Sequence, residues 1–262
     1  MHTQSRPPIV LVIGGNDPSG GAGLAADIQA VGALGGHPAP VVSAITVQDT
    51  VNAKSTAPVS PALIVEQARA IFADMPVAAI KLGLIATVEA AHSVAELLAT
   101  HREQPLVVDP VLTAGGGMPF ADDALVDAYL KLLAPLATII TPNTAESRRL
   151  APQAADGEAR AATLLALGCR HVLIKGADEQ TSDVHNTLFS HDGSARHFTW
   201  PRMPGSYHGS GCTLASAIAT LLARGHVPLA AVEIAQRYTW EAIRHAWKLG
   251  NGQRIPNRQV DS

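Results

Sequence analysis

The chain is poor in cysteine, aromatic residues and charge. Its 262 residues include two cysteines, and aromatic residues make up 4% of the composition. Two cysteines cannot build a disulfide scaffold, so we expect a reduced, cytoplasmic setting. Nineteen lysines and arginines stand against 22 aspartates and glutamates, a net charge of −3. This near balance excludes a broad basic surface, and we expect no nucleic-acid partner.

The sequence also lacks long apolar runs and metal-binding spacings. No run reaches the roughly 18–20 residues that span a bilayer, and residues 1–8 contain no apolar signal core. We therefore expect no membrane partner. The 11 histidines are scattered, and none has zinc-binding spacing. Hydrophobic residues still account for 47% of the chain, enough for a large core.

Short apolar runs alternate with longer helical stretches over most of the chain. The runs predict strands at Ile9–Ile13, Val41–Val47, Ala78–Leu84, Leu106–Val111, Thr138–Thr141 and His171–Lys175. The stretches between them predict helices over 21–34, 61–72, 88–100, 121–133 and 158–167. Such repeated strand–helix–strand units predict a mostly parallel central sheet with helices on both faces, a three-layer α/β/α fold.

The pattern changes after the sixth strand. Asn186–Ser190 and Arg196–Trp200 flank the turn sequence His191-Asp192-Gly193-Ser194, which predicts an antiparallel hairpin at the sheet edge. Two further helices are predicted over Gly211–Arg224 and Leu229–Leu249.

No Pro/Ser-rich linker or abrupt change in charge divides the chain. We therefore expect a single domain over residues 1–262, with flexible ends at 1–8 and 250–262.

Glycines and polar residues follow the predicted strands. These groups are Gly14–Gly23, Gln48-Asp49, Lys81-Leu82-Gly83, Asp109-Pro110, Pro142–Glu146 and Lys175-Gly176. Ligands of parallel sheets bind beyond the carboxyl ends of the strands. The placement of these groups therefore indicates a small-molecule enzyme.

The first glycine segment, 14–23, has two interpretations. It is no Walker A loop, because Gly21 stands at the lysine position. Gly21, Gly23 and Ala26 match a loose dinucleotide motif, with Asp49 as the acid, so a nicotinamide-dependent oxidoreductase stays possible. Alternatively, these glycines only form a tight turn between strand and helix.

The second glycine segment precedes an apolar helix. Gly209, Ser210 and Gly211 place backbone N–H groups at a helix N-terminus, which predicts an anion hole for phosphate. Cys212 lies in the same positive field, which favours its thiolate. The alternative is a small buried cysteine in the first helical turn.

Four further polar residues allow both a structural and a functional interpretation. Asn143 and Glu146 form an N-x-x-E pattern that suits a helix cap or a Mg²⁺ site. Asp109 at a strand end has the same ambiguity. Lys175 either steers a phosphate or extends its ammonium from the rim of the sheet.

Two motifs carry a resemblance to a known family. Asp17-Pro18-Ser19-Gly20-Gly21-Ala22-Gly23, with Asp27 further on, and His208-Gly209-Ser210-Gly211-Cys212-Thr213-Leu214 resemble the signatures of hydroxymethylpyrimidine and phosphomethylpyrimidine kinases. Between them the family's order continues with Lys81-Leu82-Gly83, Asp109-Pro110-Val111, Thr141-Pro142-Asn143 with Glu146, and Lys175-Gly176. The resemblance runs from Ile9 to Trp247 and implies a ribokinase-like fold.

The resemblance implies ATP-dependent phosphorylation of 4-amino-5-hydroxymethyl-2-methylpyrimidine, and then of its phosphate, in thiamine diphosphate biosynthesis. It also implies a homodimer. The implied pyrimidine pocket comprises Gly15, Ala22, Asp27, Gln48, Leu84 and Val111. The implied nucleotide-binding residues are Asn143, Lys175 and Gly176, and the implied Mg²⁺ ligands are Asp109 and Glu146. Gly209, Ser210 and Gly211 form the implied anion hole, and Cys212 is the implied proton acceptor.

The chain departs from the family's pattern in places. Leu84 stands where the family often has Met, a similar volume. Leu112–Phe120 contains no Lys or Arg where members commonly carry a basic residue, a departure that bears on the second phosphorylation. A pyridoxal kinase of the same superfamily also stays possible, as does a binding regulator with a decayed site.

Overall fold

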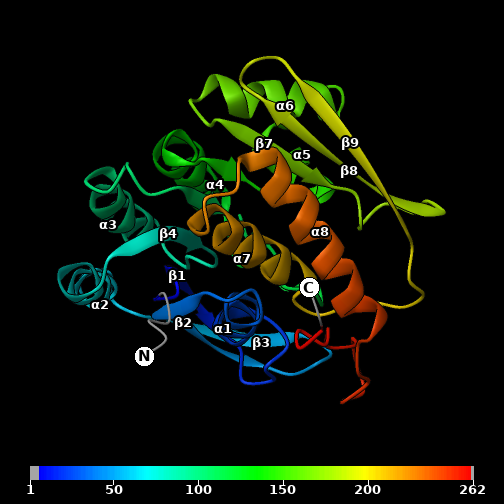
Figure 1. The fold of residues 1–262 in the computed structure, drawn as a ribbon, viewed down its shortest axis with the longest axis horizontal. Coiled ribbons are helices and arrows are strands. Elements are labelled where there is room, and N and C mark those ends of the chain that lie inside the picture. Colours follow the sequence, from blue (N-terminus) through cyan, green and yellow to red (C-terminus); the bar gives the residue numbers. More distant parts are fainter. Residues whose placement is uncertain (1–5, 261–262) are drawn as a thin grey trace, which may run out of the picture.

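The structure is a computed structural model that describes residues 6–260. One nine-stranded sheet in the order β3-β2-β1-β4-β5-β6-β7-β8-β9 runs through it (Figure 1). The strands are β1 (Ile9–Asn16), β2 (His37–Gln48), β3 (Ala53–Pro58), β4 (Val77–Leu82), β5 (Leu106–Val108), β6 (Ile139–Ile140), β7 (His171–Lys175), β8 (Asp183–Ser190) and β9 (Ala195–Pro201). Six neighbouring strands are parallel: β2, β1, β4, β5, β6 and β7. The strands β3, β8 and β9 pair antiparallel at the two edges.

Helices follow most strands. They are α1 (Gly23–Ala33), α2 (Pro61–Asp74), α3 (Val88–Ala99), α4 (Asp123–Ala128), α5 (Thr144–Leu150), α6 (Gly157–Ala166), α7 (Ser210–Ala223) and α8 (Pro228–Arg244). Between α4 and β6 the chain forms a π-helical turn over Tyr129–Leu133 and a 3₁₀ turn over Ala134–Leu136.

Alternate strand residues divide the core into two layers. Val10 and Val12 pack with residues of α1, α7 and α8. Leu11 and Ile13 point to the opposite face and pack with residues of α2 to α6. This alternation follows the two-residue period of a strand. The predicted fold, a mostly parallel sheet between two helical layers with an antiparallel edge hairpin, is confirmed.

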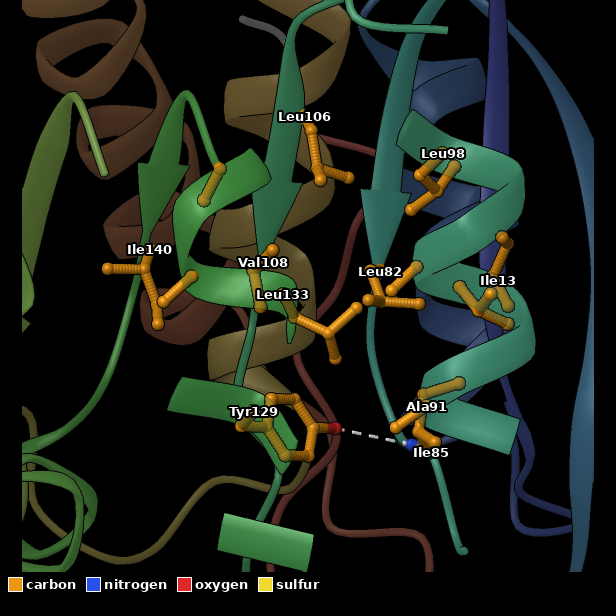
Figure 2. Packing of buried hydrophobic residues seen from close by; sticks show 14 of the residues in the cluster. Ile13, Leu82, Ile85, Ala91, Leu98, Leu106, Val108, Tyr129, Leu133 and Ile140 are labelled. Carbon is orange, nitrogen blue, oxygen red and sulfur yellow. Dashed lines mark hydrogen bonds between the residues drawn. The ribbon is translucent and has the colours of Figure 1, made fainter. Parts of the chain in front are cut away.

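A buried tyrosine shows how this core accommodates polar groups (Figure 2). The Tyr129 hydroxyl accepts a hydrogen bond from the Ile85 backbone N–H at 3.3 Å and donates to the Gly83 carbonyl at 3.2 Å. Leu133 points between β4 and β5, toward Leu82 and Val108, in the same view. The aromatic ring thus fills the core while its polar atom stays paired, and it supports the chain that follows β4.

The sequence-based elements differ from the structure in several places, and they omit the short helix α5. They also omit β3, whose Ala-Lys-Ser-Thr-Ala-Pro sequence has no apolar alternation because the strand lies at an edge. The last helix ends at Arg244, not Leu249. Residues 250–260, which belong to the predicted flexible end, include two buried side chains, Ile255 and Arg258. Residues 1–5 and 261–262, which belong to the predicted flexible ends, lie outside the described residues.

Within residues 6–260, no helix combines the length and apolarity that crossing a membrane requires.

Candidate active site

Two adjoining cavities open at the carboxyl ends of the parallel strands. The first has a volume of about 150 Å³ and lies over β1, β2 and β4, and the second, of about 410 Å³, lies beside β8, β9 and α8. Both are lined by Asn143, Lys175, Tyr207 and Gly211. Two ligands bound in these cavities would therefore meet at the last residue of β7 and the start of α7.

The N-terminus of α7 forms the junction. Gly209 is its cap and has a left-handed φ of 76°, which favours glycine. The Thr213 N–H donates to the Gly209 carbonyl at 2.9 Å, so the N–H groups before it have no partner within the helix. Gly209 and Cys212 line the first cavity, Ser210 lines the second, and Gly211 lines both. The structure thus brings the predicted anion-hole residues together.

The protonation state of Cys212 differs from the sequence-based prediction. Burial raises the pKa of its thiol to about 11, although the positive charge of Lys81 opposes this shift. Asp109 and Asp27 raise the pKa further because their negative charges disfavour a thiolate. The pKa of Cys212 therefore lies above its ordinary value, the opposite direction to the lowering that the sequence predicted.

A buried lysine faces the helix N-terminus. The Lys175 ammonium donates to Asp109 Oδ1 at 2.9 Å, and the Thr141 hydroxyl donates to the same oxygen at 3.1 Å. Burial raises the pKa of Asp109, but the Lys175 and Lys81 charges outweigh it and hold the pKa below its ordinary value. A Cβ on Gly211 would lie 3.1 Å from Lys175 Nζ, so glycine permits this close approach.

Asn143 and Glu146 form the helix cap that was one of the two interpretations open from the sequence. They form a capping box at the start of α5: Asn143 Oδ1 accepts from the Glu146 N–H, and Glu146 Oε2 accepts from the Asn143 N–H, both at 2.8 Å. Both side chains also line the first cavity. Burial raises the pKa of Glu146 to about 7, with Lys175 opposing the shift. The cap therefore fixes a carboxylate at the cavity wall.

Most predicted substrate residues line the first cavity: Gly15, Ala22, Gln48, Leu84 and Val111. Asp27 does not line it, and its predicted contact with substrate does not fit its position. Its side chain is fully buried, and both carboxylate oxygens accept hydrogen bonds from the Lys81 ammonium at 2.8 and 2.9 Å. Asp27 thus neutralises a buried lysine beneath the site.

Gly176, the predicted nucleotide contact, lines neither cavity. Its N–H donates to Asn186 Oδ1 at 3.0 Å, and a Cβ at this position would lie 2.3 Å from the His185 carbonyl oxygen. Close packing against β8 therefore requires glycine at this position.

Other site residues escaped the sequence-based interpretation. Asp17 and His208 occur in the two signatures but had no assigned role, and the structure places them in contact at the first cavity. Trp200 and Trp240 line the second cavity from β9 and α8, with ring centroids 6.3 Å apart. No spacing in the sequence pairs these two tryptophans, since they meet only through the fold.

The fold and the site together define a class of protein. A helix N-terminus and a buried lysine lie between two ligand cavities on a parallel sheet, an arrangement suited to a small-molecule phosphotransferase. Residues 17–257 match the phosphomethylpyrimidine kinase family, and the chain belongs to that family.

Relatives span most of the chain. A hydroxymethylpyrimidine/phosphomethylpyrimidine kinase of Mycobacterium tuberculosis is 39% identical over 255 residues, which cover 94% of this chain and 92% of that protein. The thiamine biosynthesis bifunctional protein ThiED of Geobacter sulfurreducens is 40% identical over 249 residues. This match covers 93% of the chain but spans only 50% of the bifunctional protein.

Solved structures of kinases with two different named activities share the fold. The pyridoxal kinase of Staphylococcus aureus in complex with pyridoxal has a TM-score of 0.88 at 27% identity, covering 97% of this chain and 94% of that chain. The phosphomethylpyrimidine kinase of Clostridium difficile has a TM-score of 0.77 at 30% identity, covering 91% and 100%. The S. aureus enzyme is also described with AMP-PCP and with ADP.

Proposed function

We propose that the chain uses ATP to phosphorylate 4-amino-5-hydroxymethyl-2-methylpyrimidine in thiamine biosynthesis. The observation that carries this function is the meeting of two cavities at the N-terminus of α7. The substrate hydroxymethyl group enters from the first cavity and the ATP γ-phosphate from the second. The family, and the ATP analogue and ADP bound by related kinases, support this assignment.

The residues at the junction suit phosphoryl transfer. The transition state is loose, so alignment and neutralisation of charge on the phosphoryl oxygens supply most of the catalysis. The free N–H groups at the start of α7 and the Lys175 ammonium both direct positive charge to this point. Because Cys212 is a thiol, it holds its own proton and acts as a hydrogen-bonding neighbour of the substrate hydroxyl rather than as a preformed base.

Asp109 and Glu146 would hold Mg²⁺. Both carboxylates line the first cavity near the shared residues, and Mg²⁺ favours one or two carboxylates together with substrate phosphates. Within the described residues, the side-chain hydrogen bonds to Asp109 fall on Oδ1 and that to Glu146 falls on Oε2. Oδ2 and Oε1 therefore suit a cation, which would neutralise charge on the transferred phosphoryl group.

The second phosphorylation, of the pyrimidine phosphate, is part of the same proposal. A substrate phosphate adds negative charge to the first cavity, whose lining includes Lys81 and Lys175. The loop over 112–120 contributes Thr113, Ala114, Gly115 and Phe120 to this lining but no cation. Because Asp27 already neutralises Lys81, Lys175 and the N–H groups of α7 have to neutralise most of the added charge.

We further propose a homodimer in the cytoplasm. Ile45, Val47 and Val51 are exposed by 53%, 58% and 55% near the β3 edge of the sheet. Covering such apolar side chains by a second copy would remove them from water. Both cysteines are free, as expected in a reducing compartment.

ADP release with the hydroxymethylpyrimidine, compared with pyridoxal, tests the proposed function. We expect the pyrimidine to have the higher kcat/KM.

Lys175→Met should lower kcat by about a hundredfold or more, because it removes a charge from the junction. Lys131→Met is the matched control, since Lys131 forms an exposed pair with Asp127 and lines neither cavity. Preferential turnover of pyridoxal would reassign the enzyme as a pyridoxal kinase.

A further inference from the structure

The histidine of the second signature contacts two residues of the first cavity through one nitrogen. His208 Nε2 lies 2.7 Å from Asp17 Oδ2 and 2.8 Å from the Gln48 carboxamide nitrogen. Asp17 and His208 are 4% and 5% exposed. All three residues line the first cavity, and Gln48 is the family's candidate for recognition of the pyrimidine.

One imidazole nitrogen cannot serve as donor and acceptor at the same time. Burial raises the pKa of Asp17, but hydrogen bonds from His208 and Ser19 outweigh it and keep the carboxylate ionised. An ionised carboxylate only accepts, so Nε2 carries hydrogen and donates to Asp17. The single Nε2–H is then shared between Asp17 Oδ2 and the Gln48 atom that faces it, so that atom must be the amide oxygen, and the placement of the Gln48 amide oxygen and nitrogen is reversed.

The surrounding chain holds the imidazole in this position. Asp17 also accepts from the N–H groups of Ser19 and Ala22, at 2.9 and 2.8 Å, and from the Ser19 hydroxyl at 3.0 Å, so four hydrogen bonds fix its carboxylate. A Cβ on Gly21 would lie 2.2 Å from His208 Cδ2, which shows that the ring packs directly on this glycine. The imidazole therefore has little room to rotate away from Gln48.

We propose that His208, oriented by Asp17, is a positioning residue that fixes the Gln48 carboxamide and thereby selects an aminopyrimidine. The amide oxygen faces His208 and accepts from the ring amino group with its second lone pair. The amide NH₂ group donates to the adjacent ring nitrogen. A 4-oxo ring presents an acceptor and an N–H at these positions, so it meets the wrong partner at both. The inference rests on the proposed function and assigns its specificity.

Kinetics with paired substrates tests the role of His208. We expect the wild-type protein to favour the aminopyrimidine over its 4-oxo analogue by at least about a hundredfold in kcat/KM. His208→Phe keeps a ring against Gly21 but removes the donor, so the preference should fall to within about tenfold, mainly through the pyrimidine KM. The KM for ATP should stay unchanged. In a Gln48→Leu background, adding His208→Phe should change the preference by less than about twofold.

If His208→Phe acted only by disturbing α7, its effect on the kinetics would be different. It would lower kcat equally for both rings, leave the preference unchanged and persist in the Gln48→Leu background. That result would overturn the inference while leaving the proposed kinase activity intact. Absence of aminopyrimidine turnover by the wild-type protein would instead contradict the proposed function.

Nitrogen NMR of histidine-labelled wild-type protein decides the orientation without any turnover. His208→Phe identifies the resonance by its disappearance. Hydrogen on Nε2 of His208, in the neutral or the charged ring, is the expected result. A ring with hydrogen on Nδ1 alone would let Nε2 accept from the Gln48 NH₂ group and would overturn the inference.

Discussion

Cys212 illustrates how burial decides the chemistry of a side chain. The positive charge of Lys81 favours its thiolate, whereas burial and the carboxylates of Asp109 and Asp27 favour the thiol. The second group of effects is larger, and the pKa rises to about 11. Sequence motifs reveal the helix N-terminus but not the burial, so the sequence alone predicted a lowered pKa for Cys212.

This protonation state predicts the pH dependence of alkylation. The rate of Cys212 modification by iodoacetamide should keep rising up to a pH of about 11, because only the thiolate reacts. Cys169 is fully buried with a pKa of about 12 and serves as the internal control that should react more slowly. Peptide mapping by mass separates the two sites. A rate that levels off near pH 7 would mean that Cys212 is a thiolate in the free protein.

The Lys81–Asp27 pair makes a prediction about stability. Both side chains are buried, and the ion pair lies beneath the first cavity. Lys81→Met or Asp27→Leu should each lower the free energy of unfolding by about 3–5 kcal/mol, because each leaves one charge buried without its partner. The double variant should lose much less than the sum of the two single losses. Urea titrations measure this, and additive losses would show that the two charges do not interact.

At the scale of elements, the start of α7 is held by close backbone packing. A Cβ on Gly209 would lie 2.1 Å from the Gly21 carbonyl oxygen, and Gly209 also has a left-handed φ. Gly225, after the same helix, has a φ of 87° and no atom within 4 Å of such a Cβ. Alanine substitutions at the two glycines therefore separate the free-energy cost of a steric clash from that of a left-handed backbone conformation.

Gly225→Ala should lower the free energy of unfolding by about 1–2 kcal/mol and leave turnover unchanged. Gly209→Ala should lose more stability and should reduce kcat by about a hundredfold or more, since the clash moves the N–H groups of α7. Thermal unfolding and ADP release measure the two effects. Equal behaviour of the two variants would remove the N-terminus of α7 from the proposed mechanism.

The chain after α8 braces both glycine segments. Arg258 is 1% exposed, and its guanidinium donates to the Gly21 carbonyl, to Thr213 Oγ1 at 2.8 Å and to Gln29 Oε1 at 3.3 Å. It thus links the loop before α1 to the first turn of α7. The interpretation of this segment as a polar, flexible end missed it, because the partners lie 45 to 237 residues away in sequence.

Arg258→Met should lower kcat/KM by about tenfold or more while changing the free energy of unfolding by about 1–3 kcal/mol. Arg224→Met is the control, because Arg224 also donates to a carbonyl, but to that of Leu34, which belongs to neither glycine segment. Initial rates give kcat/KM for both variants, and urea titrations give their free energies of unfolding. Unchanged kcat/KM in Arg258→Met would show that the brace is not needed for activity.

For the whole molecule, sequence pattern and structure agree where local periodicity carries the information. The parallel strands, the edge hairpin and the helix that starts near Gly211 all follow from apolar spacing and glycine placement. The polar edge strand β3 and the partner of Asp27 could not be predicted. An edge strand needs no apolar face, and Lys81 lies 54 residues from Asp27. Long-range pairing of polar groups is a property of the assembled fold.

The central claim is that the two cavities supply substrate and ATP to one junction. The most direct test incubates the protein with Mg²⁺–ATP and 4-amino-5-hydroxymethyl-2-methylpyrimidine and resolves the products by mass over time. The account predicts a monophosphate first and a diphosphate later, with one ADP released for each phosphate added. ADP release without any phosphorylated pyrimidine, or no ADP release at all, would contradict it.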